Sequence, residues 1–252
     1  MTLKKIREKA KWIDPFTYVD KYIVPKVNPN NNENLNLVIY VISAFIFAWA
    51  IYTALGLAFG TPTPMVIVVS GSMEPVYHRG DVIVLFGASP QNVFASEIET
   101  GFSSLRGISF SQFAVPQYAL TGNGVQIQSI EFNNGTVLPI EKTGSIVVYY
   151  SKLSRKPIIH RAVAKLKAED GYYLLTKGDS IYNNTIDQDC GLVINGNPQK
   201  TCIELYPVPI KNLDGTAVLQ IPLIGCAKLW VFDNLASLAT TGALPPDFSG
   251  VC

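Results

Sequence analysis

A short run of small residues around Ser72 has the composition of a catalytic turn. Residues 69–75 read VSGSMEP and begin 11 residues beyond Ala58, where a long uncharged stretch ends. Gly71 permits tight backbone geometry before Ser72, and Pro75 fixes the chain after it. A turn of this kind can present a hydroxyl and its own N–H to a bound carbonyl. The sequence therefore predicts a hydrolytic nucleophile at Ser72, near a membrane.

Such a serine needs a base to take its proton, and histidine titrates in the right pH range. The chain has two histidines. His160 lies in the apolar run 158–163, where a polar ring is either a satisfied core histidine or a functional base. His78 precedes Arg79-Gly80-Asp81, which indicates a turn into the next strand.

Lysine is the alternative base, because a buried neutral lysine can replace histidine. Lys165 and Lys167 alternate with Ala164 and Leu166, a pattern typical of a solvated strand face. Lys177 qualifies only if its side chain turns inward.

Carboxylates follow in the segment 176–179 (TKGD) and at Asp187 and Asp189. A carboxylate that accepts the imidazole N–H sets the histidine tautomer and stabilises the imidazolium. Two other interpretations are a solvated acidic loop and a calcium loop made by Asp179, Asp187 and Asp189. The spacing of the three acids does not match an EF-hand.

These residues need a membrane anchor and a rigid domain to position them. Residues 35–58 carry no charge over 24 positions, enough to cross a bilayer. The stretch is too long for the apolar region of a cleaved signal, so we interpret it as a permanent signal anchor. The alternative is a buried helix of a soluble protein, but such helices are usually shorter and keep a polar face.

Charge predicts the orientation of that anchor. Residues 1–34 contain seven Lys/Arg and four acids, whereas the rest of the chain has 13 basic and 15 acidic residues. By the positive-inside rule the basic segment 1–34 stays in the cytoplasm and the chain beyond Gly60 lies outside. The net charge of +1 gives no indication of nucleic-acid binding.

Beyond the span, short apolar runs separated by turn residues predict a mainly β exterior domain. We place a catalytic β domain at 59–86 and 144–226. Asp170-Gly171 indicates a hairpin turn. The predicted strands are 65–69, 81–86, 145–150, 158–166, 172–176 and 218–221.

Two further segments differ from this pattern. Residues 87–143 are rich in Ser, Gly, Gln and Asn; we interpret them as an inserted small lobe with one hairpin around Asn134-Gly135. No candidate catalytic residue lies there, so the lobe is expected to be dispensable for bond cleavage. The tail 227–252 is predicted to be amphipathic, since Lys228 and Asp233 argue against a second span.

Four cysteines, Cys190, Cys202, Cys226 and Cys252, all follow the span. An even count on the exterior side permits two disulfides, and three pairings are open. Zinc is the alternative, although the chain has no CxxC pair and both histidines are distant in sequence.

Together these segments resemble type I signal peptidases, in the branch of archaea and the endoplasmic reticulum where histidine replaces the bacterial lysine. The resemblance covers the span and about two-thirds of the exterior. It rests on residues 70–85 (SGSMEPVYHRGDVIVL), 144–149 (GSIVVY), 157–162 (PIIHRA), 176–179 (TKGD) and 221–225 (IPLIG).

The resemblance implies a role for each site residue. Ser72 matches the nucleophile, His160 the general base and Asp179 the first aspartate of the family. Ser70 matches a hydroxyl that assists the oxyanion hole, with the Ser72 N–H as its partner. The fold implied is a signal-peptidase-like β catalytic domain on one N-terminal transmembrane helix.

The second aspartate is less direct, because Ser180-Ile181-Tyr182 intervenes before the Asn-Asn pair. Asp187 is the better match, as the acid that orients His160, and Asp189 is the alternative. Asp179 is then expected mainly to hold the loop. The lobe 87–143 is also longer than the usual connection of the family.

The implied activity is that of a single-pass membrane serine endopeptidase that removes signal peptides from secretory preproteins after small residues. Met73 and residues 65–69 would line the substrate groove. No metal or organic cofactor is implied. The expected partners are preproteins, the lipid bilayer and the protein translocation machinery, and no nucleic acid. The alternative is a catalytically silent, membrane-anchored β domain that binds exported chains.

Overall fold

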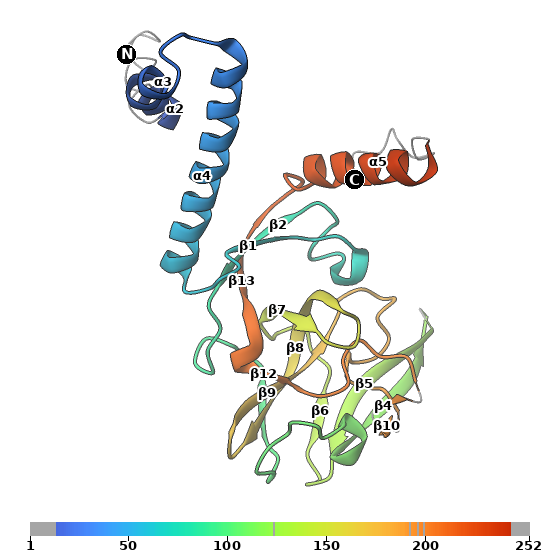
Figure 1. Cartoon of the computed structure of the whole chain (residues 1–252). Helices are drawn as coiled ribbons and strands as arrows, with labels where there is room; N and C mark the ends of the chain where they lie inside the picture. Colours follow the sequence, from blue (N-terminus) through green and yellow to red (C-terminus); the bar gives the residue numbers. More distant parts are fainter. Residues whose placement is uncertain (1–13, 123, 192, 196, 199, 243–252) are drawn as a thin grey trace, which may run out of the picture. The chain divides into compact units, whose positions relative to one another are not determined.

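The computed structural model describes residues 14–242 except 123, 192, 196 and 199. The chain divides into two compact units, residues 1–58 and 59–252 (Figure 1). The first unit is helical and the second is mostly β, so the predicted mainly β class is confirmed.

The first unit contains one long helix preceded by three short helical segments. Asn32 caps the long helix, because its side-chain oxygen accepts the N–H groups of Asn34 (3.0 Å) and Leu35 (3.3 Å). The elements are α2 (Pro15–Tyr18), a π-helical turn (Val19–Ile23), α3 (Val24–Val27) and α4 (Glu33–Phe59).

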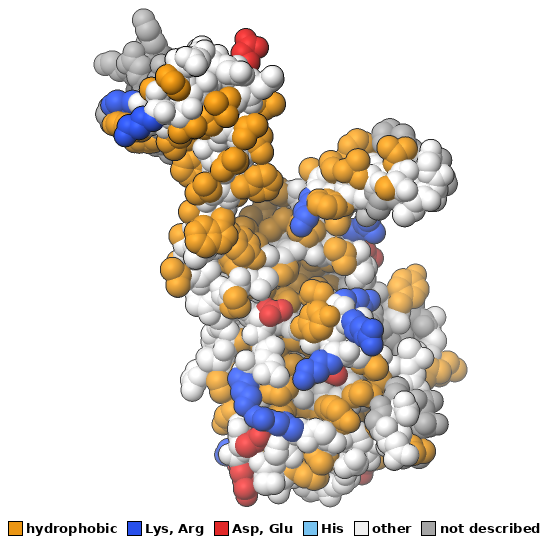
Figure 2. Space-filling model, viewed as in Figure 1, with side chains coloured by type: hydrophobic (Ala, Val, Ile, Leu, Met, Phe, Trp, Pro, Cys, Tyr) orange, Lys and Arg blue, Asp and Glu red, His pale blue; other side chains and the backbone are white. Residues whose placement is uncertain are grey.

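Helix α4 exposes many apolar side chains, and those on the face seen in Figure 2 are orange. Leu37, Phe45, Trp49 and Leu57 are each more than 60% exposed. Among the described residues it is the one helix long and apolar enough to cross a membrane, and it lies near the N-terminus. An all-apolar surface of this length is stable in lipid rather than in water. The predicted span, 35–58, lies inside α4.

The second unit is built on an eight-stranded sheet of order β1-β2-β13-β7-β8-β9-β12, with β3 paired to β8. All pairings are antiparallel except that of β3 with β8. The strands are β1 (Met65–Ile67), β2 (Val82–Phe86), β3 (Ser96–Glu99), β7 (Ile146–Ser151), β8 (Lys156–Ala168), β9 (Gly171–Lys177), β12 (Val208–Pro209) and β13 (Leu213–Ile221).

Each strand predicted from an apolar run overlaps one of these strands. The β8–β9 hairpin turns at Asp170-Gly171, as expected, and Gly171 has a φ of 139°, which favours glycine. β13 begins before the predicted strand 218–221 and includes Asp214-Gly215, a residue pair that is typical of turns. In the structure the register shifts there, and a Cβ on Gly215 would lie 2.6 Å from the Phe86 carbonyl oxygen.

The segment 87–143 is divided between two sheets. β4 (Ala114–Thr121), β5 (Gly124–Phe132) and β6 (Val137–Pro139) form a separate three-stranded antiparallel sheet. The β5–β6 hairpin was predicted; β4, an edge strand that contains Pro116, was not. β3 belongs instead to the large sheet.

One buried cluster joins the two sheets. Ile127 and Ile130 of β5 share it with Val163 and Leu166 of β8. We therefore expect replacement of 87–143 by a short linker to expose apolar surface of β8, which argues against treating the whole segment as dispensable.

The remaining elements include α5 (Cys226–Thr241), which begins one residue before the predicted tail 227–252 and overlaps it. Short 3-10 turns cover Gly71–Met73, Phe110–Gln112 and Ile210–Asn212, and β10 (Val193–Ile194) pairs with β11 (Asn197–Pro198). A disulfide joins Cys190 to Cys202 with a Cα–Cα distance of 4.9 Å. Cys252 lies outside the described residues.

Candidate active site

His160 lies on the inner face of β8. Strand alternation places it on the same face as Ile158 and Ala162, and all three are buried. On the neighbouring strand β7, Val147 is its direct partner. The imidazole is only 2% exposed, so its polar atoms need partners within the protein.

Asp187 supplies that partner. Its Oδ2 lies 2.6 Å from His160 Nδ1, and the Asp187 side chain is almost fully buried. The Asp187 N–H donates to the Thr176 carbonyl (2.8 Å), which ties the loop to the end of β9. A proton held on Nδ1 by the carboxylate leaves the Nε2 lone pair available as a base.

Two hydroxyls that sequence reasoning missed complete this network. Thr176 Oγ1 donates to Asp187 Oδ2 (2.6 Å), and the Tyr149 hydroxyl donates to the same oxygen (3.0 Å). The Gln188 side chain donates from Nε2 to Thr176 Oγ1 (3.2 Å), and its Oε1 accepts the Thr176 backbone N–H (3.0 Å). Burial and the nearby Asp187 charge hold the pKa of Tyr149 well above its ordinary value, so its hydroxyl keeps its proton.

Strand pairing contains the signal that would have found both hydroxyls. Tyr149 lies two residues after Val147, the partner of His160, and Thr176 pairs with Ala162, two residues after His160. Period-two alternation therefore puts Tyr149, Thr176 and His160 on one face of the sheet.

Ser72 occupies the 3-10 turn Gly71–Met73, directly after Ser70 in extended conformation. The Ser72 hydroxyl lies 3.4 Å from that of Ser70. No hydrogen bond joins Ser72 to His160 among the described residues. Ser72 is partly exposed, so its hydroxyl is accessible from solvent.

The loop after β9 nevertheless fixes the backbone of this turn. The Ser180 N–H donates to the Ser72 carbonyl at 3.0 Å. A Cβ on Gly178 would lie 2.6 Å from that same carbonyl oxygen. Glycine is thus required at 178 for this close approach. The loop that contains the acids therefore also contacts the backbone of the turn that contains Ser72.

Asp179 faces a different partner from Asp187. The Asp179 carboxylate accepts hydrogen bonds from Arg161 Nε (2.9 Å) and Nη2 (2.6 Å). Arg161 Nη1 donates to the Gly144 carbonyl (2.7 Å). Lys142 Nζ donates to the Asp179 backbone carbonyl (2.8 Å). This forked, buried ion pair links β8, the segment before β7 and the loop after β9.

Asp189, the alternative acid, points elsewhere. It accepts hydrogen bonds from Lys200 (2.6 Å), from Thr185 (2.9 Å) and from Tyr118. Burial raises the pKa of the Asp189 carboxyl, but these hydrogen bonds outweigh burial and the net shift is downward. The three acids 179, 187 and 189 thus have separate partners.

The other candidate bases also have defined surroundings. His78 lies in the predicted turn, where its backbone N–H donates to the Asp81 carboxylate (2.8 Å). Lys165 pairs with Glu97 (3.0 Å) and Lys167 with Glu99 (2.7 Å).

Lys177 does turn inward. It is 9% exposed, its Nζ donates to the Gly178 carbonyl (2.9 Å), and burial together with the charge of Lys142 lowers its pKa. Among the described residues, Lys177 Nζ makes its hydrogen bond to this backbone carbonyl and not to the Ser72 hydroxyl. Lys177 therefore meets the burial condition for a lysine base and needs a direct test against His160.

The structure corrects one substrate-groove expectation. Met73 is completely buried, in a cluster with Val68, Tyr77 and Ile83. Met73 therefore anchors the turn Gly71–Met73 in the core and does not line a groove. By contrast, Val69 is 59% exposed.

No group of three or more His, Cys, Asp and Glu side chains suited to a metal occurs within the described residues. Two of the four cysteines considered for zinc form the disulfide already described.

No protein-family model matches the chain. It is distantly homologous to proteins named signal peptidase complex catalytic subunit SEC11. That of Clavispora lusitaniae is 25% identical over 209 residues, which cover 82% of this chain and 88% of the relative. That of Sclerotinia sclerotiorum is 27% identical over 200 residues (79% and 80%), and that of Schizosaccharomyces pombe 27% over 208 residues (79% and 81%).

Proposed function

We propose that this chain, which is distantly homologous to signal peptidase complex catalytic subunits, is a membrane-bound serine endopeptidase that removes signal peptides from secretory preproteins. The observation that carries the proposal is the buried His160–Asp187 contact at 2.6 Å, reached by the same loop that hydrogen-bonds the backbone of Ser72. This arrangement supports an acid–base pair beside a serine nucleophile.

In the proposed reaction, His160 Nε2 takes the proton of the Ser72 hydroxyl as Oγ attacks the carbonyl carbon of the scissile bond. Asp187 stabilises the imidazolium that forms, and His160 then gives the proton to the leaving amine. Water hydrolyses the acyl-enzyme by the same path. The Ser70 hydroxyl and the Ser72 N–H are the proposed donors to the oxyanion.

In this proposal, substrate binding brings the Ser72 hydroxyl into hydrogen-bond distance of His160. Catalytic hydrogen bonds are often long without substrate and tighten in the complex. Gly178 restricts the turn through its close approach to the Ser72 carbonyl, and Pro75 fixes the chain after it. We propose cleavage after small residues on the basis of the family resemblance.

The proposed location is a cell membrane, with residues 1–34 in the cytoplasm and the β unit outside. The candidate span α4 and the seven basic residues before it support this orientation. Because the relatives are named as subunits of a complex, we propose accessory subunits as partners, besides preproteins, the bilayer and the translocation machinery.

A processing assay tests the proposal. The full-length chain in detergent is incubated with a model preprotein, and the mature product is followed on a gel. Ser72→Ala should abolish processing, whereas Ser103→Ala, at an exposed surface position, should process like the wild type. Equal processing, or equal absence of processing, by wild type and Ser72→Ala would contradict the proposed function and favour a silent binding domain.

A further inference from the structure

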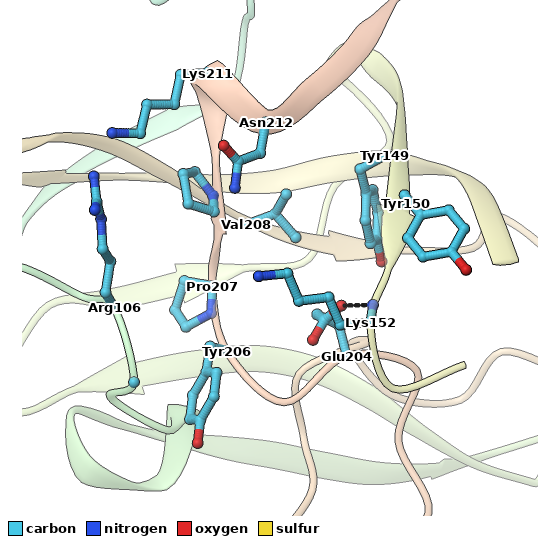
Figure 3. Close-up of a pocket in the computed structure, with 12 residues that line it drawn as sticks. Arg106, Tyr149, Tyr150, Lys152, Glu204, Tyr206, Pro207, Val208, Lys211 and Asn212 are labelled. Atoms are coloured by element: carbon cyan, nitrogen blue, oxygen red, sulfur yellow. Dashed lines mark hydrogen bonds between the residues drawn. The ribbon is translucent and has the colours of Figure 1, made fainter. Parts of the chain in front are cut away.

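A pocket of the β unit borders the candidate active site and shares Tyr149 with it, the residue whose hydroxyl donates to Asp187. It has a volume of about 400 Å³ and lies between residues 106–107, 149–152 and 204–212 (Figure 3). That volume is within the range of small-molecule sites, roughly 300–1,000 Å³. The pocket therefore has room for a ligand of a few to a few dozen atoms.

Three cationic side chains line this pocket: Arg106, Lys152 and Lys211. Figure 3 shows the Arg106 and Lys211 side chains ending on the same side of the pocket, while Lys152 reaches toward its middle. In the part of the chain that the structure describes, neither lysine ammonium group has a hydrogen-bond or ion-pair partner. Unpaired charges grouped in a concave site attract a counter-ion.

Two acids lie near these cations, and both accept hydrogen bonds from neutral donors. Glu204, the one acid in the lining, accepts the backbone N–H groups of Lys152 (2.8 Å) and Leu205 (2.9 Å). Just outside, Asp170 accepts the hydroxyls of Tyr173 (2.7 Å) and Ser104 (3.0 Å). Both carboxylates keep their charge in these hydrogen bonds, but the lining has three cations against the single acid Glu204, so the cations are only partly neutralised.

Asp170 interacts with two of these cations, Arg106 and Lys211. Arg106 Nε lies 3.5 Å from its carboxylate. Hydrogen bonds from Tyr173 and Ser104, and then the charges of Arg106 and Lys211, lower the pKa of the Asp170 carboxyl. Because Figure 3 shows the Arg106 and Lys211 side chains ending on the same side of the pocket, the two cations can act on the same anion.

We propose that this pocket binds a small anion carrying a phosphate group, held by Arg106, Lys152 and Lys211. A phosphate offers several acceptor oxygens and up to two charges, which matches a guanidinium fork and two ammonium groups better than a single carboxylate does. Tyr150 and Tyr206 at the edges add flat surfaces for the rest of the ligand. The source is either a soluble phosphate ester or a lipid headgroup.

Calorimetric titration of the full-length chain in neutral detergent tests this site with two probes, inorganic phosphate and a short-chain soluble phosphatidic acid. Saturable binding of both is expected, weaker at higher salt. Equal affinity for the two probes indicates a free phosphate ester as the ligand, and tighter phosphatidic acid binding indicates a headgroup. Absence of saturable binding of either probe would overturn the proposal.

Variants locate the binding. Lys152→Gln combined with Lys211→Gln should weaken binding of both probes by roughly a hundredfold, since each of the two lost charge-assisted contacts is worth about a factor of ten. Lys156→Gln, at an exposed position outside the lining, is the matched control and should bind as the wild type does. Unchanged affinity in the double variant, or equal loss in the control, contradicts the site.

Thermal midpoints check that each variant folds. If the double variant is destabilised, Lys211→Gln alone gives the same comparison, because Lys211 is exposed and its ammonium has no recorded partner in the described chain. The readout is binding and not cleavage, so its outcome is independent of the proposed peptidase function.

Discussion

His160 and Ser72, the two halves of the candidate active site, lie in contrasting surroundings. The imidazole is 2% exposed, and the carboxylate beside it accepts two further side-chain hydrogen bonds. The Ser72 hydroxyl lies on a partly exposed turn, and its recorded neighbour is the Ser70 hydroxyl at 3.4 Å. The base is therefore fixed by core side chains, whereas the nucleophile is fixed only through its backbone.

This difference has a consequence for mutations. Buried polar groups that lose a partner are costly, so changes around His160 should affect both rate and stability. Changes to the Ser72 side chain remove little that the fold depends on and should affect rate alone. Variants of the residues around His160, with their matched controls, test whether the two halves separate in this way.

The largest effect in the network is expected at Asp187. Asp187→Asn weakens the control of the His160 tautomer and removes the charge that stabilises the imidazolium, so turnover should fall by about 10⁴-fold. The thermal midpoint should also fall, because three donors converge on this carboxylate. Processing rate and thermal unfolding are measured together.

Asp189→Asn is the matched control for that variant, since Asp189 is also buried but is bonded to Lys200 and Thr185. It should leave the rate nearly unchanged. A mild Asp187→Asn together with a severe Asp189→Asn would reverse the assignment of the two acids.

Asp179 should behave as a structural acid. Asp179→Asn breaks the forked pair with Arg161 and leaves a mostly buried guanidinium without its counter-charge, a loss of about 3 kcal/mol. The thermal midpoint should fall by roughly 6–12 °C, with a smaller loss of rate than at Asp187. A large loss of rate with an unchanged midpoint would instead place Asp179 in the chemistry.

The smallest effect is expected at Tyr149. Tyr149→Phe removes one of the hydroxyls on Asp187 and keeps the ring that packs in the core, so it should cost about 1 kcal/mol of stability. The rate should fall less than tenfold, and Thr176→Val should have a comparable effect on rate. If Tyr149→Phe reduced turnover as severely as Asp187→Asn, the hydroxyl would be part of the chemistry and not a support for it.

Much of this arrangement could be predicted from local sequence. The uncharged stretch predicted the span, the apolar runs predicted the strands that carry His160, and Asp170-Gly171 predicted a hairpin turn. These features depend on periodicity and turn chemistry within a few residues.

The features that could not be predicted depend on pairing between distant segments. Strand β3 has a charged, alternating sequence, and its place beside β8 follows from long-range parallel pairing. The fork between Arg161 and Asp179 and the hydroxyl of Tyr149 become visible only when strand register is known. Met73 was assigned to a groove because nothing local distinguishes a core methionine from a surface one.

The central claim, that buried His160 activates exposed Ser72, is tested most directly by comparing His160→Ala with Lys177→Ala. Lys177 is the matched control because it is also buried, lies on the adjacent strand and has a lowered pKa. With folding verified by thermal unfolding, His160→Ala should reduce preprotein processing at least about 10⁴-fold, and Lys177→Ala should retain measurable processing. Loss of all processing in a folded Lys177→Ala, with activity remaining in His160→Ala, would contradict the account and assign the base to lysine.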